Sequence, residues 1–232
     1  MISTHLIPKK TDDFFSIVRG RRSISEFADM PIVDDVIDEL IRVSGYAPSG
    51  TDIQPWFFLV VRTETGKAGL IDLIAKGYEE TKRRLISKKG MAGPMFGLIL
   101  DAFAKYGKFD TAPAYILAFS RPYDKAFLSR VIELSGDSDI ANIADESAKT
   151  SVAMAMQNLL LTAHAMGLGT RVKDGIKFFL NDSELKREFF QLFSIPSDYR
   201  LISGIQLGYP TESALRRKAS PRLSLDSIRR YA

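Results

Sequence analysis

The stretch from Ser151 to Gly169 constrains the fold most, because it runs for 19 residues without a formal charge. Its length would suit a membrane span, but its middle holds polar side chains that hydrocarbon would penalise: Gln157, Asn158, Thr162 and His164. We therefore expect a buried helix within a longer helical pattern, Asp145 to Met166. One side of that helix is small and apolar, as suits a domain centre or a dimer seam: Ala148, Val152, Ala155, Leu159 and Ala163.

The rest of the chain alternates between helical patterns and short apolar runs. Periodicity predicts helices in four further places: from Thr11 to Gly20, from Pro31 to Gly45, over residues 64–87, and through Phe193 after a capping box of Asn181 and Glu184. Apolar runs predict buried strands at Trp56 to Val61, Ala114 to Phe119, Thr170 to Val172 and Tyr199 to Leu207.

The 232 residues contain no internal repeat and no low-complexity linker, so we expect a single α+β domain over residues 1–232. Residues 88–110 are the least regular part. The tail, residues 211–232, is expected to be extended, because Pro210 and Pro221 interrupt regular structure. No segment before residue 30 has the pattern of a secretory signal, which favours a cytoplasmic protein.

The composition narrows the chemistry sharply. The chain has no cysteine, which excludes disulfides, thiolate nucleophiles, iron–sulfur clusters and cysteine zinc sites. Its two histidines, His5 and His164, are poor candidates for a Ser-His-Asp triad. A Gly-rich dinucleotide fingerprint and a P-loop are both missing from the sequence. Carboxylates, hydroxyls or a bound cofactor must therefore supply any difficult chemistry.

Positive charge is concentrated near the C-terminus. The net charge is +4, but residues 216–230 alone carry six basic side chains against one aspartate. Such a surplus could meet nucleic acid, a membrane surface or a phosphate, or could simply face solvent. A second basic feature, Arg21 and Arg22 followed by Ser23, has the donors of a phosphate clamp, because guanidinium groups bind phosphate oxygens bidentately.

Four motifs, taken in order, carry a resemblance: Arg21-Arg22-Ser23-Ile24 followed by Phe27, Ala47-Pro48-Ser49-Gly50-Thr51-Asp52-Ile53-Gln54-Pro55-Trp56, Met166-Gly167-Leu168-Gly169-Thr170, and Leu207-Gly208-Tyr209-Pro210. Together they resemble the FMN-dependent nitroreductase family over about residues 14 to 228. The resemblance implies a nitroreductase-like α+β fold. Its central, mostly antiparallel sheet would be flanked by helices in an intertwined homodimer, with FMN bound at the subunit interface by residues from both chains.

The resemblance also implies which residues bind the cofactor. Arg21, Arg22 and Ser23 would hold the flavin phosphate and ribityl chain, together with Arg222. The partner subunit would contribute Pro48, Ser49, Gly50 and Asp52 to line the flavin ring. A backbone N–H at Asp174 and Gly175 would face flavin N5, where a fixed dipole needs no reorganisation during reaction. Ser25 and Lys173 complete the predicted cofactor-binding set; no catalytic side chain and no metal ligand is expected.

Two positions depart from the family pattern. Ser25 stands where the family usually has a lysine or arginine near the flavin pyrimidine, and Asp52 replaces the usual asparagine. A carboxylate at this place would oppose the charge of the reduced flavin unless it were protonated or paired. We hypothesise that Arg171, Lys173 or Arg84 supplies the missing positive charge.

The implied activity is that of an NAD(P)H-dependent oxidoreductase reducing nitroaromatic or quinone-like acceptors by two-electron, hydride, ping-pong transfer. Residues 88–110 would roof the acceptor with Phe96, Phe103, Tyr106 and Phe109. Alternatives on the same fold are reductive dehalogenation, flavin-consuming oxygen chemistry, or a flavin-binding protein without turnover. The expected partners are a second copy of the chain and a small aromatic electron acceptor, with neither nucleic acid nor a membrane.

Overall fold

The fold is built on one four-stranded antiparallel sheet. The computed structural model describes residues 11–87, 97–98, 101, 112–122, 130, 133–136, 138–218 and 220–231. The strands lie in the order β1 (Trp56–Val61), β2 (Ala114–Ser120), β4 (Arg200–Gly208) and β3 (Gly169–Lys173). Every neighbouring pair is antiparallel. The predicted α+β class and the antiparallel sheet are therefore confirmed.

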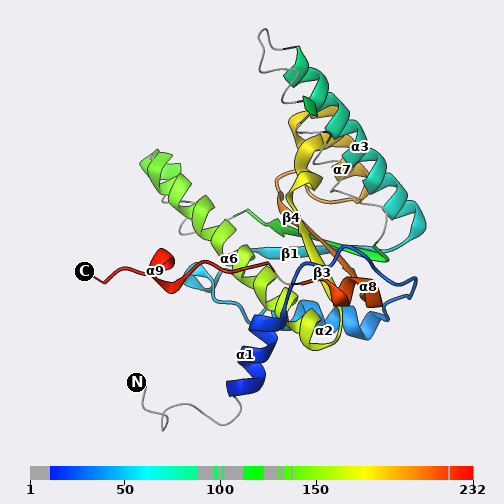
Figure 1. Cartoon of the computed structure of the whole chain (residues 1–232). Helices are drawn as coiled ribbons and strands as arrows, with labels where there is room; N and C mark the ends of the chain where they lie inside the picture. Colours follow the sequence, from blue (N-terminus) through cyan, green and yellow to red (C-terminus); the bar gives the residue numbers. More distant parts are fainter. Residues whose placement is uncertain are drawn as a thin grey trace.

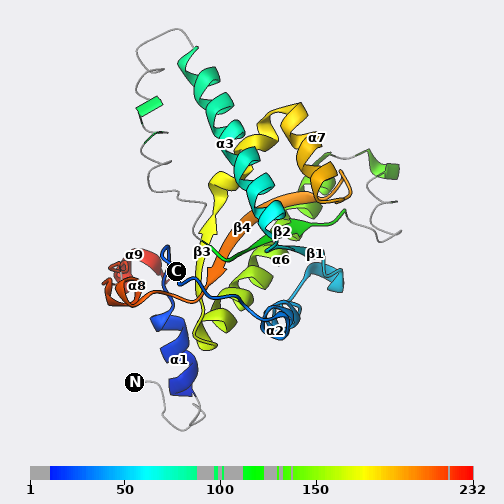
Figure 2. The ribbon, with the colours of Figure 1, turned by 90° about the vertical axis from the view of Figure 1, so that its right-hand side faces the viewer.

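Helices cover both faces of this sheet (Figures 1 and 2). Their bounds are α1 Thr11–Gly20, α2 Asp34–Ser44, α3 Glu64–Ile86, α6 Ser138–Ala165, α7 Ser183–Leu192, α8 Glu212–Arg216 and α9 Leu225–Ile228, with 3-10 helices η2 Gly50–Asp52 and η3 Asp174–Asn181. Helices α2 and α6 pack on one face, while α3, α7 and η3 pack on the other.

The sequence of strand β2 is a continuous apolar run because both faces of the strand are buried. Successive side chains of a strand point to opposite faces. Ile116 and Ala118 therefore join the core beneath α2 and α6, whereas Tyr115, Leu117 and Phe119 join the core beneath α3 and α7. All seven residues of the strand are buried. A strand covered on both sides has no solvent face for polar residues.

Helix α6 crosses the sheet diagonally (Figure 1). Its small apolar side is buried within the chain's own core, where Val152, Ala155, Leu159 and Ala163 are 0% exposed. Of the two interpretations left open for this side, the domain centre is the one found. Among the described residues, no helix is long and apolar enough to span a membrane.

Three local expectations need correction. Asp182, not Asn181, caps α7: its Oδ1 accepts the backbone N–H groups of Glu184 and Leu185 at 2.9 and 3.0 Å, while Asn181 ends η3. Helix α6 begins at Ser138, before the predicted start. The tail is not wholly extended, because it contains α8 and α9.

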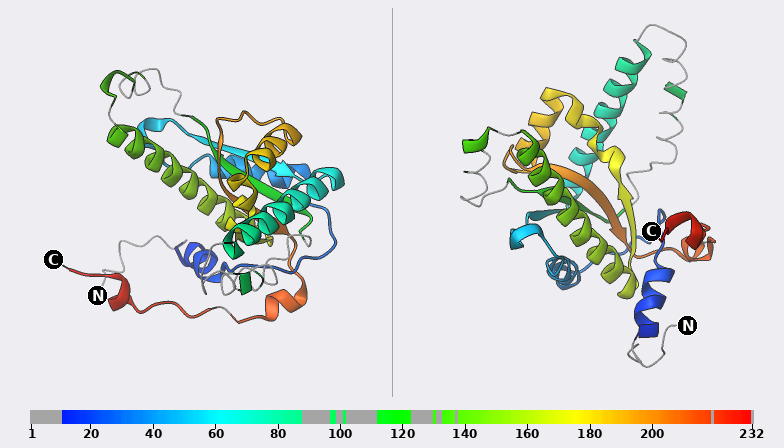
Figure 3. Two further views of the ribbon diagram at one scale, coloured as in Figure 1. Left: turned by 90° about the horizontal axis from the view of Figure 1, so that it is seen from above. Right: turned by 90° about the vertical axis from the view of Figure 1, so that its left-hand side faces the viewer.

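The tail runs outside the body of the domain (Figure 3). Every described residue from Ser220 to Tyr231 is exposed. The aromatic residues proposed to roof the acceptor, Phe96, Phe103, Tyr106 and Phe109, lie outside the described residues. The lid therefore stays a prediction.

Candidate functional site

The predicted phosphate clamp is fixed beside strand β3. Ser23 forms a parallel bridge with Thr170, and the backbone N–H of Ile24 donates to the Thr170 carbonyl at 2.9 Å. The approach is close: a Cβ on Gly169 would lie 2.8 Å from the Cβ of Ile24, so a larger residue at 169 would displace the segment. The Met166–Thr170 motif thus provides the surface along which the Arg21–Ser23 segment runs.

Six basic residues gather around this strand, and we call them the basic edge: Arg21, Arg22, Arg171, Lys173, Arg217 and Arg222. Burial lowers the pKa of Arg21, and nearby Arg222 lowers it further. Burial and then Arg217 lower the pKa of Arg171. The structure therefore brings together residues from the N-terminal segment, β3 and the tail, which are far apart in the sequence.

Lys173, at the end of β3, is only 7% exposed. Burial, with a smaller contribution from Arg171, lowers its pKa to about 8. The next residue, Asp174, accepts a hydrogen bond from Ser203 Oγ at 3.0 Å and pairs with Lys177 Nζ at 3.1 Å. These contacts hold the turn that contains Gly175, where the resemblance expects a backbone donor.

The guanidinium of Arg22, unlike that of Arg21, is held by backbone carbonyls of the tail. It donates to the backbone carbonyls of Leu215 and Arg217, and so ties the end of α8 to the N-terminal segment. Arg217 in turn lies 3.4 Å from Ser25 Oγ and pairs with Glu26. A guanidinium from the tail therefore stands beside the serine that replaces the family's cation.

Sequence reasoning did not identify Arg217 as a site residue, although it lies in the basic run of residues 216–218. Of the cations that were suggested as replacements, Arg171 and Lys173 belong to the basic edge. Arg84 lies in the exposed last turn of α3, which points away from β3 (Figure 2). His164, a poor catalytic candidate by sequence, lies beside this segment: a Cβ on Gly20 would lie 2.9 Å from its Nε2, and burial, then Arg21 and Arg22, lower its pKa.

The second part of the predicted site is the Pro48–Gln54 loop. Thr51, Asp52 and Gln54 all have positive φ, at 51°, 53° and 48°. Side chains hold this strained shape: Ser49 Oγ accepts the Gln54 N–H at 3.0 Å, and Asp52 Oδ1 accepts the Gln54 amide at 2.9 Å. Strained backbone that is fixed in this way is typical of ligand-contacting loops.

The two parts lie at opposite edges of the sheet. The Pro48–Gln54 loop leads into β1, whereas the basic edge surrounds β3, and β2 and β4 separate them. Three inter-strand spacings amount to about 14 Å. Within one chain, therefore, the loop and the basic edge lie apart, and we call them the two candidate half-sites.

The comparisons with known proteins agree with this architecture. The model of the Nitroreductase family matches residues 18–209. The Bacillus subtilis (strain 168) protein YfhC, provisionally named an NAD(P)H nitroreductase, is 28% identical over 205 residues, 88% of each chain. The iodotyrosine deiodinase of Nematostella vectensis is 23% identical over 212 residues, covering 89% of this chain and 70% of that protein.

Two solved structures show the fold. A BluB-like flavoprotein from Clostridium difficile 630 has a TM-score of 0.74 at 21% identity, with 94% of this chain and 98% of that chain covered. The FMN-dependent nitroreductase NfnB from Mycobacterium smegmatis, in complex with NADPH, has a TM-score of 0.69 at 17% identity, with 97% and 100% covered.

Proposed function

Because this chain belongs to the nitroreductase family, we propose that it binds FMN and acts as an NAD(P)H-dependent oxidoreductase on small aromatic acceptors. The names of its relatives and structural neighbours support the two cofactors. The acceptor would be a nitroaromatic or quinone-like compound. The chain's own residues would bind and orient the reactants rather than react with them.

One observation carries the proposal: Arg222 lies close enough to Arg21 to lower its pKa, so two guanidinium groups meet at one place on the basic edge. Glu26 pairs with Arg217. Neither Arg21 nor Arg222 has an ion pair within the part of the chain that the structure describes, and Arg222 donates only to the Ser220 carbonyl, at 3.1 Å. A phosphate group offers the oxygens that such guanidinium groups bind bidentately. The donor set therefore fits the phosphate of FMN.

The remaining residues fit the flavin ring. Bound FMN would supply the two-electron chemistry between NAD(P)H and the acceptor. Lys173, Arg171 and Arg217 would place positive charge near the ring, and so favour its anionic reduced form. The turn at Asp174 and Gly175 would present a backbone donor. Asp52 of the partner subunit would lie beside the ring. Its Oδ1 already accepts a hydrogen bond from the Gln54 side-chain amide.

A homodimer would join the two half-sites. The loop of one subunit can complete the basic edge of the other, which it cannot do within its own chain. Exposed apolar side chains also favour a second copy as the partner, since large exposed apolar patches mark interfaces. On α1 and the tail these are Phe14, Val18, Leu223, Leu225, Ile228 and Tyr231, from 41 to 80% exposed.

A second candidate is reductive dehalogenation, which the iodotyrosine deiodinase relative supports. It uses the same cofactor site and differs in the acceptor. Release of iodide from an iodophenol, measured beside nitroarene and quinone reduction, separates the two activities. A flavin-binding protein without turnover would support none of these reactions.

The deciding experiment is an absorbance spectrum of the purified protein. We expect a yellow protein that bleaches on anaerobic addition of NADH or NADPH and recovers when a nitroarene or quinone is added. A colourless protein that takes up no added FMN would contradict the proposal. A yellow protein that neither bleaches nor recovers would leave only flavin binding.

A further inference from the structure

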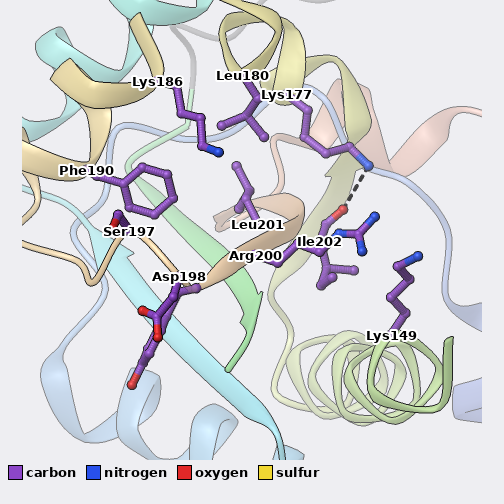
Figure 4. A pocket seen from close by; sticks show the side chains of 11 residues that line it. Lys149, Lys177, Leu180, Lys186, Phe190, Ser197, Asp198, Arg200, Leu201 and Ile202 are labelled. Carbon is purple, nitrogen blue, oxygen red and sulfur yellow. Dashed lines mark hydrogen bonds between the residues drawn. The ribbon is translucent and has the colours of Figure 1, made fainter. Parts of the chain in front are cut away.

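A separate cavity of about 610 Å³ opens between η3, α7, the start of β4 and α6 (Figure 4). Four cations line it: Lys149, Lys177, Lys186 and Arg200. In Figure 4 the charged ends of Lys149, Lys177 and Arg200 gather at one side, whereas Lys186 lies near Phe190 and Leu201. None of the residues predicted to bind the cofactor lines this cavity. Its walls are therefore suited to a molecule with an anionic group and an apolar body.

Ion pairs surround the cavity. Asp145 pairs with Lys149 at 2.8 Å and with Arg200 at 2.5 Å, Glu146 also pairs with Lys149, and Asp174 pairs with Lys177 at 3.1 Å. None of these three carboxylates is among the lining residues, whereas Asp198 is. Each pair therefore contributes its cation, and not its carboxylate, to the lining.

These cations retain donors for a ligand. An ammonium has three N–H donors and a guanidinium five. Lys177 uses donors on the Ile202 carbonyl, at 2.9 Å, and on Asp174. The Arg200 bonds to Asp145 come from a single guanidinium nitrogen, Nη1. Lys186 is exposed and has no ion pair among the described residues.

The cavity adjoins the proposed flavin site through Asp174. That residue precedes Gly175, contacts Lys177 in the cavity wall and accepts from Ser203 beside the lining residue Ile202. An acceptor that reacts beside Gly175 therefore lies next to the turn whose Lys177 lines the cavity.

We infer that the cavity binds the anionic substituent of the electron acceptor, so that the preferred substrates are aromatic carboxylates or similar anions. Their ring would rest against Phe190 and Leu201 with the anionic group at Lys186, and Lys149, Lys177 and Arg200 would attract the charge from the other side of the cavity. This inference rests on the proposed reductase function. It adds a class of substrate, which the flavin site itself does not define.

The test compares 4-nitrobenzoate with its neutral methyl ester, using the purified holoprotein and NAD(P)H. We expect kcat/KM to favour the acid, and Lys186→Gln to reduce that preference about fivefold, because a charge-assisted contact is lost. Arg187→Gln is the matched control, since Arg187 is the next residue of α7, is also exposed, and is not among the residues that line the cavity. Calorimetric binding of benzoate provides a second readout that needs no turnover.

The outcomes distinguish the two proposals. Equal kcat/KM for acid and ester, or a preference that Lys186→Gln leaves unchanged, would overturn the anion site while the reductase stands. Benzoate binding that Lys186→Gln weakens and Arg187→Gln does not, in a protein that reduces neither these compounds nor a quinone, would support the anion site and refute the reductase. Absence of both binding and turnover would refute both proposals.

Discussion

The basic edge and the cavity at the start of β4 both contain several cations, but the pKa values of these cations shift in opposite directions. At the basic edge, burial lowers the pKa of Arg21, Arg171 and Lys173, with nearby cations adding to the effect. In the cavity, hydrogen bonds to Asp145 and Glu146 raise the pKa of Lys149. Burial alone would raise the pKa of Asp145, but Lys149 and Arg200 lower it overall.

The difference indicates different ligands. At the basic edge the folded chain carries desolvated positive charge, so a bound phosphate removes an existing cost and should bind tightly. In the cavity, an incoming anion must share its cations with aspartates that already bind them. The basic edge is therefore suited to anchoring a cofactor, and the cavity to selecting among acceptors.

The largest expected effect concerns Arg21. Replacing it with glutamine should raise the Kd for FMN about 100-fold, because charge-assisted bonds to phosphate worth about 2–3 kcal/mol are lost. Quenching of flavin fluorescence during titration measures this. Arg229→Gln is the control, because it removes the same charge from an arginine that pairs with Asp226 at 3.1 Å. Equal losses in both variants would mean that only the total charge matters.

Lys173 gives the next effect. Its folded pKa of about 8 lies below the ordinary 10.5, so between these values the unfolded chain binds more protons. The free energy of unfolding of the flavin-free protein should therefore rise with pH in this window, by about 1–2 kcal/mol.

Urea denaturation at pH 7.5 and pH 10 tests this, with Lys173→Met as the comparison. The variant should lack the rise, and saturating FMN should reduce it in the wild type, because a bound anion favours the ammonium. If the free energy of unfolding of the wild type does not rise with pH, the buried charge of Lys173 is already balanced. The basic edge would then not differ from the cavity in this respect.

The smallest effect is expected at Asp145. Asp145→Asn should lower the free energy of unfolding at pH 7 by about 0.5–1 kcal/mol, since the lost pairs are partly exposed. Because the folded pKa of Asp145 is lowered, its contribution is present at neutral pH and is lost as the pH falls through that pKa. The stabilities of wild type and variant should therefore converge in acid.

Thermal denaturation across this pH range checks that prediction. Glu39→Gln serves as a control, because among the described residues Glu39 pairs with Arg42 alone, on the exposed face of α2. Asp145→Asn should also strengthen benzoate binding, since Lys149 and Arg200 lose a competing carboxylate. Unchanged or weaker binding would contradict the view that the aspartate restrains the cavity.

Local patterns predicted most of the fold. β1 lies at the predicted residues, and β2, β3 and β4 differ by only a residue or two, because strands covered on both faces leave unbroken apolar runs. The cap of α7 was misassigned because Asn181 and Asp182 are both good capping residues, and only the preceding η3 decides between them. Such a choice depends on tertiary context.

The site was predictable only in part. Motif order identified the Arg21–Ser23 segment and the turn at Asp174, and the structure brings both to β3. Arg217 was missed because its contact with Ser25 joins residues 192 positions apart, and no local pattern encodes such a pairing. The separation of the Pro48–Gln54 loop from the basic edge also could not be predicted, because the order of strands in a sheet does not follow from their spacing along the chain.

The strand order also has a genetic consequence. If each dimer has two sites, each built from the loop of one subunit and the basic edge of the other, then a defect in either half spoils both sites of a pure mutant dimer. A hybrid of a loop mutant and a basic-edge mutant would instead contain one intact site and one doubly defective site. Two inactive alleles expressed together should then complement each other, whereas two alleles damaged in the same half should not.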